Sequence, residues 1–142
     1  MPKLFLRGLA VLVLSLDVAG CAQFERHQQN ISMQDRTNSY RKAIRWSEYD
    51  IAKSFIQRQD ESAYEYDADF YNAIRVVENE IESREMFSEE GFAKVYSKVK
   101  FYHVDYNTVT DLVDEQLWWY DEETENWYLD GGFPNYKAAL GQ

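Results

Sequence analysis

The sequence contains a single cysteine, Cys21, and only two histidines, His27 and His103. A lone cysteine excludes an intrachain disulfide and a zinc site built from cysteine thiolates. The sequence also lacks a Gly-x-Ser-x-Gly nucleophile turn and a His-Glu-x-x-His helix, which are typical of common hydrolases and metalloproteases. We therefore expect no catalysis, no cofactor and no metal site in this chain.

Basic residues are scarce relative to acidic ones: 15 Lys and Arg stand against 25 Asp and Glu, for a net charge of −10. Loss of an N-terminal segment with Lys3, Arg7 and Asp17 would leave 13 basic and 24 acidic residues, and a net charge of −11. A charge of this sign repels nucleic acid and anionic headgroups. We therefore expect no nucleic acid partner.

A long hydrophobic run is also absent. The apolar stretch 9–16 is too short to span about 30 Å of hydrocarbon. Lys3 and Arg7 precede this stretch, and the small residues Ala19 and Gly20 follow it. This order of basic, apolar and small residues is typical of a secretory signal, so we expect the segment 1–20 to be removed from the mature protein.

The residues Val18-Ala19-Gly20-Cys21 follow this signal directly and resemble the lipobox of bacterial lipoproteins. In that family the cysteine receives a thioether-linked diacylglycerol, the signal is cut before it, and the new N-terminus is often acylated. The resemblance implies that Cys21 is lipidated and attaches the protein to a membrane. Ala22, not Asp, comes next, which by the family's sorting rule implies export to the outer membrane, facing the periplasm. Cleavage after Ala22, as in an ordinary secreted protein, and an uncleaved anchor stay open.

The remaining chain divides into a tether and one domain. Residues 21–38 are polar and lack sustained periodicity, which predicts a flexible tether. From Ser39 onward, apolar residues recur at three- and four-residue spacing, which predicts one broken helix or two short ones, the second opening at Ser47. A further short helix is expected over 61–72. The domain therefore spans 39–142.

Beyond Ala73 the hydrophobic period changes from helical to alternating. This pattern predicts strands over 74–86, 92–104, 109–120 and 126–129, joined by short turns, and so an antiparallel meander. Helices followed by such a meander give an α+β fold with the helices packed on one face of the sheet. The order resembles the NTF2-like and cystatin-like cones over about 39–136.

Three polar groupings have both a chemical and a structural interpretation. His103 and Asp105 project from one face of a strand and could serve acid-base or metal chemistry, but a surface or turn histidine at a strand end is the favoured interpretation. A second grouping consists of Glu78, Glu80 and Glu82, which alternate along one strand. It is better explained as a solvated row that faces the lysines of the next strand than as a cation site. The acidic run 121–125 is interpreted as a hairpin tip, and His27 as part of the tether.

Aromatic residues gather in the last two predicted strands. Adjacent tryptophans on a strand point to opposite faces, so one of the pair 118 and 119 is expected in the core and the other on the far side. The far-side rings form a candidate contact patch, unless they only lock the hairpin. The residues considered for this patch are Trp118, Trp119, Tyr120, Trp127 and Tyr128.

The sequence thus predicts a small outer-membrane lipoprotein whose acidic periplasmic domain acts through contacts with another protein. Two alternatives remain. One is a cone that binds a small ligand or catalyses a reaction with one acid inside, and it requires a pocket with a buried carboxylate of raised pKa. The other is a binder of cell-wall polysaccharide, which requires coplanar exposed rings.

Overall fold

The computed structural model describes the backbone of residues 3–142 and the side chains of residues 20–142. The chain divides into two units, Met1–Ser32 and Met33–Gln142. Helix α1 (Lys3–Arg45) begins in the first unit and ends in the second. The expected signal segment, 1–20, lies almost wholly outside the described side chains. Within the described part of the chain, no helix is both long and apolar enough to cross a bilayer.

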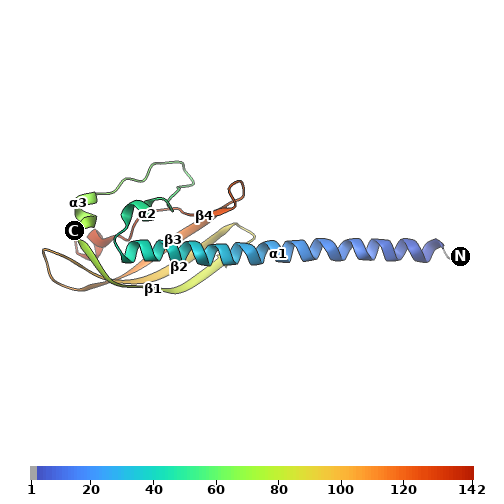
Figure 1. Ribbon diagram of the computed structural model, residues 1–142, viewed down its shortest axis with the longest axis horizontal. Coiled ribbons are helices and arrows are strands. Elements are labelled where there is room, and N and C mark those ends of the chain that lie inside the picture. Colours follow the sequence, from blue (N-terminus) through green and yellow to red (C-terminus); the bar gives the residue numbers. More distant parts are fainter. Residues whose placement is uncertain (1–2) are drawn as a thin grey trace. The chain divides into compact units, whose positions relative to one another are not determined.

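The second unit has an α+β fold, as predicted. Its strands pair in the order β1-β2-β3-β4, each antiparallel to the next (Figure 1). The strand ends lie within one residue of the predicted positions. The elements after α1 are α2 (Tyr49–Lys53), α3 (Ala68–Asn72), β1 (Ile74–Phe87), β2 (Phe92–His103), β3 (Thr110–Asp121), β4 (Asn126–Leu129) and α4 (Tyr136–Ala139).

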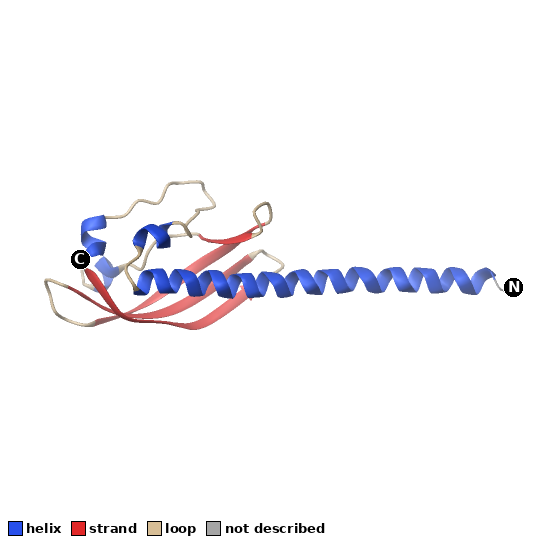
Figure 2. Ribbon diagram, viewed as in Figure 1, coloured by secondary structure: helices blue, strands red, loops and turns tan. Residues whose placement is uncertain are grey.

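The core lies between the sheet and the helices. Figure 2 shows the last part of α1 running alongside the strands. On β2, alternate side chains are fully buried and pack in one cluster with the α1 residues Tyr40 and Ile44. The opposite face of β2 carries lysines, so the predicted division into a covered and a wet face is confirmed. The buried apolar β2 residues are Ala93, Val95, Val99 and Phe101, and Ser97 and His103 are buried on the same face.

Helix α1 corrects the expectation of a flexible tether over 21–38. The whole segment is helical, and the compact second unit begins at Met33, not Ser39. Met33 and Thr37 are buried, and the Thr37 hydroxyl donates a hydrogen bond of 2.9 Å to the Met33 carbonyl. This bond satisfies the only polar group of the Thr37 side chain, which allows it to lie in the core.

Ser47 ends α1 rather than opening α2. Its φ of +58° is left-handed, and its N–H donates to the Ile44 carbonyl (3.2 Å), while the Glu48 N–H donates to the Ala43 carbonyl (2.8 Å). This pair of bonds is a Schellman motif, in which the left-handed position is usually glycine. Glu48 is the N-cap of α2 but makes no side-chain capping bond. The break between two helices was predicted correctly, whereas the role of Ser47 was not.

The helix predicted over 61–72 is wrong in its first half. Only α3, from Ala68 to Asn72, is helical, and the Asp67 side chain caps it by accepting a 3.2 Å bond from the Phe70 N–H. Upstream, Tyr64 and Tyr66 both pack against Phe133, with ring centroids 5.1 and 4.8 Å away. Because this contact uses residues two positions apart, it favours an extended backbone over a helix.

The outer edge of β4 is covered by a short parallel bridge between Ile56 and Leu129. The Leu129 N–H donates to the Phe55 carbonyl (2.8 Å), and the Gln57 N–H donates to the Leu129 carbonyl (3.1 Å). These two bonds satisfy backbone groups that an open edge would leave to solvent. The segment after α2 therefore extends the sheet by one bridge, although its sequence gave no strand signal.

Candidate functional site

Cys21, the expected lipidation site, is exposed and lies on α1. It precedes Met33, the first residue of the compact second unit, by twelve positions. Its thiol is therefore open to solvent, and eight of the eleven residues between it and Met33 are polar.

The five aromatic residues considered as a contact patch do not form one surface. Trp118 and Trp127 are fully buried, and Tyr120 packs against Trp127 with ring centroids 5.2 Å apart. Trp119 and Tyr128 lie on the opposite face, 5.6 Å apart. The indole N–H of Trp119 donates a 2.7 Å bond to the carbonyl of Gln57. The division of the tryptophan pair was predicted, but only Trp119 and Tyr128 remain of the patch.

Two phenylalanines extend these far-side rings toward β1. Phe87 and Phe92 are cross-strand neighbours, and Phe92 in turn faces Trp119. The rings of Phe87 and Phe92 stack on each other, 4.5 Å apart with an interplanar angle of 16°. Trp119 and Tyr128 are inclined by 39°. Because these rings cover one another, the row does not offer the flat platform that stacking on a sugar requires.

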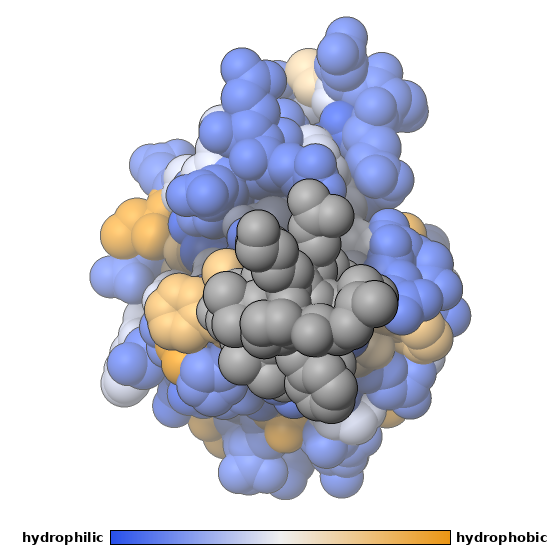
Figure 3. Space-filling model, turned by 90° about the vertical axis from the view of Figure 1, so that its right-hand side faces the viewer, coloured by the Kyte–Doolittle hydropathy of each residue, from blue (hydrophilic) through white to orange (hydrophobic). Residues whose placement is uncertain are grey.

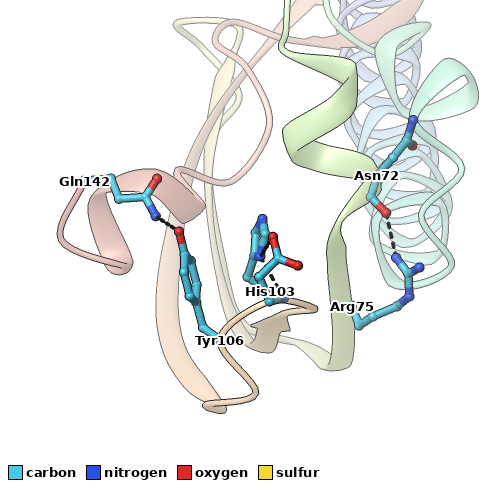
Figure 4. Close-up of polar contacts among 6 residues, drawn as sticks. Asn72, Arg75, His103, Tyr106 and Gln142 are labelled. Carbon is cyan, nitrogen blue, oxygen red and sulfur yellow. Dashed lines mark hydrogen bonds and ion pairs between the residues drawn. The ribbon is translucent and has the colours of Figure 1, made fainter.

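His103 is buried, at 7 % exposure, so a surface position is wrong, whereas its place at the end of β2, directly before a turn, is as expected. Its ring packs between Phe70 and Tyr106, with centroids 5.6 and 4.7 Å away. The Asp105 backbone N–H donates a 3.2 Å bond to His103 Nδ1, and the Asp105 carboxylate lies 3.7 Å from the same atom. This Nδ1 is already an acceptor, so it is not free to hold a metal ion. Figure 4 shows this arrangement beside Tyr106, whose hydroxyl accepts a 3.0 Å bond from Gln142.

Two of the three carboxylates in the row on β1 face lysines, as predicted. Glu78 is paired with Lys100 at 3.3 Å, and Glu80 faces Lys98 across the strands. Glu82 falls at a register shift and has no cross-strand partner. Across residues 20–142, no group of three or more His, Cys, Asp or Glu side chains is placed to hold a metal ion. The acidic run 121–125 forms the turn between β3 and β4, as predicted.

Three alternate side chains on the inner face of β3 form a hydrogen-bonded chain that sequence reasoning missed. The Trp118 indole N–H donates to Gln116 Oε1 (3.0 Å), and Gln116 Nε2 donates to Asp114 Oδ2 (2.7 Å). Burial raises the pKa of Asp114 from 3.8 to about 6, an effect that the bond from Gln116 partly offsets. Asp114 is half-buried. A partly desolvated carboxyl with a shifted pKa is a candidate functional acid.

Two pockets open beside the turn that ends α1. The first, here the Arg45/Arg75 pocket, has a volume of about 470 Å³. The second, here the Glu48/Asp50 pocket, has about 480 Å³. The two share Ser47 and Asn72, so they adjoin. The lining of the Arg45/Arg75 pocket is Arg45, Trp46, Ser47, Asn72, Arg75 and Val76.

Both guanidiniums of the Arg45/Arg75 pocket are held by backbone carbonyls rather than by carboxylates. Arg45 Nη1 donates to the Val76 carbonyl at 2.6 Å, and the Arg45 guanidinium lies 4.7 Å from the centre of a Trp46 ring. Arg75 Nη1 donates to the carbonyls of Asn72 (2.7 Å) and Ile74 (3.0 Å), the former drawn in Figure 4. No carboxylate of the described residues lies within 4.0 Å of either guanidinium.

Two large apolar side chains are exposed at these pockets. Trp46, in the Arg45/Arg75 pocket, is 67 % exposed, and Ile51, in the Glu48/Asp50 pocket, is 53 % exposed. Figure 3 views the molecule from the side where α1 begins, not from these pockets, and around the grey atoms that side is mainly hydrophilic, with hydrophobic residues in separate places. An exposed tryptophan beside a pocket is a feature of contact surfaces, where Trp and Arg contribute strongly to binding. The sequence signals missed here were the two arginines, which are thirty positions apart.

Comparison of this chain with protein-family models, with curated proteins and with solved structures finds no match. The resemblances to lipoproteins and to NTF2-like or cystatin-like folds therefore stay predictions.

Proposed function

We propose that this chain is a bacterial outer-membrane lipoprotein, anchored through Cys21, whose acidic α+β domain acts in the periplasm by binding another protein and not by catalysis. One observation carries the anchor: the only cysteine of the chain stands at the end of a signal-like segment and is exposed. A single thiol in an exported protein has no intrachain disulfide partner, and acylation would consume it.

Lipidation would provide attachment without a transmembrane helix. Each buried CH₂ group contributes about 0.8 kcal/mol, and a single myristoyl chain gives only marginal binding. Two or three chains on one cysteine give stable attachment. The acidic domain itself does not favour an anionic membrane surface, so the lipid supplies the binding energy.

The anchor is tested by labelling cells with radioactive palmitate and by measuring the mass of the N-terminal peptide. We expect label on the wild-type protein, a mature chain that begins at Cys21, and no label on Cys21→Ser. The matched control is Cys21→Ser combined with Gln28→Cys, which keeps one cysteine but places it after His27, outside the lipobox. Equal labelling of wild type and Cys21→Ser, or an N-terminus upstream of Cys21, would contradict the anchor.

The binding role rests on the surface at the end of α1. Trp46 and Ile51 are exposed beside two adjoining pockets, and the arginines of one pocket lack a carboxylate partner in the described part of the chain. Exposed aromatic and arginine side chains of this kind are enriched in protein interfaces. The stacked and tilted rings of Phe87, Phe92, Trp119 and Tyr128 disfavour a polysaccharide binder.

Asp114 meets one of the two requirements of a second candidate, a cone that binds a small ligand or catalyses a reaction: its pKa is raised, although Asp114 lines neither of the two pockets described above. Burial raises the pKa of this carboxyl to about 6, which suits proton transfer near neutral pH. The test is a titration with small aromatic alcohols, monitored by NMR through the indole N–H of Trp118. A saturable shift that is lost in Asp114→Asn would support this candidate, and no shift at millimolar ligand would contradict it.

A further inference from the structure

The Arg45/Arg75 pocket is a local concentration of positive charge in a domain that is otherwise strongly acidic. We propose that it binds a carboxylate side chain of a partner protein, with Trp46 packing against an apolar or aromatic residue next to that carboxylate. This inference rests on the proposed function of the domain as a protein-binding module, and it identifies the site and the chemistry of the partner.

The two arginines have hydrogen-bond donors left over for a ligand. A guanidinium has five N–H donors, and Arg45 and Arg75 use only Nη1 in their bonds to backbone carbonyls. Those bonds fix the position of each guanidinium, while Nε and Nη2 have no acceptor among the described residues. A planar fork of such donors matches a carboxylate, which it can bind through two parallel bonds.

Trp46 offers an exposed apolar ring beside the guanidinium of Arg45. Its indole is 67 % exposed, and the Arg45 guanidinium lies 4.7 Å from a ring centre. Burial of this ring against an apolar side chain would remove a large hydrophobic surface from water. An acidic residue beside an aromatic or aliphatic one would therefore occupy both the guanidiniums and the indole.

The adjoining Glu48/Asp50 pocket determines how a partner segment is oriented on the site. Glu48 and Asp50 are exposed and have no ion-pair partner within the described residues. A second acidic residue of the partner would be repelled there, whereas a lysine or arginine would be attracted. The partner segment is therefore expected to place an acid at the Arg45/Arg75 pocket and a base a few residues away.

The same charges favour a protein segment over a phosphate-rich ligand or an anionic membrane. Glu48 and Asp50 lie in the pocket next to the arginines, and the chain carries a net charge of −10. A ligand with several negative charges would meet this repulsion as well as the attraction of the arginines. A single carboxylate flanked by an apolar side chain and a base would not meet this repulsion, because its base would lie near Glu48 and Asp50.

The experiment uses the full chain with Cys21→Ser, so that its result does not depend on lipidation. The probe is the peptide acetyl-Asp-Phe-Gly-Gly-Lys-amide, and its uncharged partner carries Asn in place of Asp. NMR follows the indole N–H of Trp46 and the Nε–H groups of Arg45 and Arg75. We expect saturable shifts of these three signals with the Asp peptide and an affinity at least about tenfold lower for the Asn peptide, since hydrogen bonds between charged groups are lost.

Variants then locate the site. Arg75→Gln and Trp46→Ala should each weaken binding of the Asp peptide by about tenfold or more. Arg75→Lys, which keeps the charge but loses the fork, should bind with intermediate affinity. The control is Lys98→Gln, which removes one positive charge from the exposed face of β2 and should leave affinity within about twofold.

Three results would overturn the proposal. They are equal affinity for the Asp and Asn peptides, shifts that map away from the pocket, and the same shifts from inorganic phosphate or from vesicles containing phosphatidylglycerol, which would show a general anion or membrane site. Loss of palmitate labelling would refute the anchor and leave the peptide result intact, so the two failures are distinguishable.

Discussion

Gly132 lies directly against the ring of Tyr64, so closely that a Cβ at position 132 would come within 2.5 Å of Tyr64 Cε2. The next residue, Phe133, donates its N–H to the Tyr64 hydroxyl at 2.9 Å and packs edge-on against the same ring. The extended segment before α3 is thus fastened to the segment that follows β4. This contact holds two stretches of irregular backbone against the core.

Replacement of Gly132 by Ala should therefore destabilise the domain. The added methyl group forces the Tyr64 ring to move and strains its bond to Phe133, so we expect the free energy of unfolding to fall by about 1 to 3 kcal/mol. The matched control is Gly131→Ala, because a Cβ there has no neighbour within 4 Å. Urea unfolding followed by tryptophan fluorescence measures both, and equal stability of the two variants would contradict the close approach.

Replacement of Ser47 by Gly should stabilise the domain. Ser47 has a φ of +58°, a conformation that is strained for residues with a Cβ and relaxed for glycine. We expect a gain of about 0.5 to 1 kcal/mol in the free energy of unfolding. Ser54→Gly is the control, because Ser54 ends α2 with an ordinary φ of −65° and its hydroxyl donates to the Ile51 carbonyl, so this variant should lose stability. A loss of stability in Ser47→Gly equal to that in Ser54→Gly would refute the assignment of a strained turn.

The sheet was predictable because its side chains alternate. On β2 every buried residue is apolar or small except His103, and the lysines stand between them, so the covered and the exposed face follow from the pattern, whereas the two register shifts between β1 and β2 do not. The β1 to β2 pairing adds Glu78 opposite Lys100, which the alternating charges also predicted. The bridge between Ile56 and Leu129 at the edge of β4 had no alternating pattern in the sequence, because a single bridge is too short to show a period.

The start of the domain was missed for a specific reason. Met33, Thr37, Tyr40 and Ile44 recur at spacings of four, three and four, which is a helical stripe. Thr37 counted as polar in the sequence, and the stripe therefore seemed to begin at Tyr40. In the structure the Thr37 hydroxyl bonds to the Met33 carbonyl and also accepts a 2.9 Å bond from Arg84 Nε.

The Arg45/Arg75 pocket could not be predicted from the sequence. Arg45 is the last residue of α1, and Arg75 is the second residue of β1. Only the fold brings them to one pocket: Arg45 bonds to the Val76 carbonyl of β1, and Ser47 and Asn72 line the pocket with both arginines. Asp114 was missed because a lone acid on a strand is usually solvated. Its desolvation depends on the helices that cover that face of β3.

Replacement of Ala22 by Asp tests the proposed location. By the sorting rule of the lipoprotein family, Asp after the lipidated cysteine retains the protein in the inner membrane. We expect the wild-type protein to fractionate with outer-membrane vesicles on a sucrose gradient and Ala22→Asp with the inner membrane. The control is Ala22→Asn, which is similar in size and uncharged. Identical fractionation of wild type and Ala22→Asp would refute the proposed outer-membrane location.

Asp114 should make the stability of the domain depend on pH in the direction opposite to that of an ion-paired carboxylate. Its pKa is about 6 in the folded state and 3.8 when the carboxyl is exposed to solvent, as it is in the unfolded chain, so the folded state binds the proton more tightly. Between about pH 4 and pH 6 the folded protein therefore carries more protons than the unfolded chain. The contribution of Asp114 to stability is fully present below pH 4 and is lost as the pH rises through 6.

Asp114→Asn removes this ionisation while its carbonyl still accepts the bond from Gln116. Two pKa units correspond to about 3 kcal/mol, so we expect the variant to be more stable than the wild type at pH 7.5 by up to about that amount. The difference should vanish near pH 4, where the wild-type carboxyl is protonated. Asp111→Asn, on the exposed face of the same strand, is the control for the loss of one negative charge. Urea unfolding at both pH values measures the effect, and a stability difference that is the same at pH 4 and pH 7.5 would show that Asp114 is not desolvated in the folded protein.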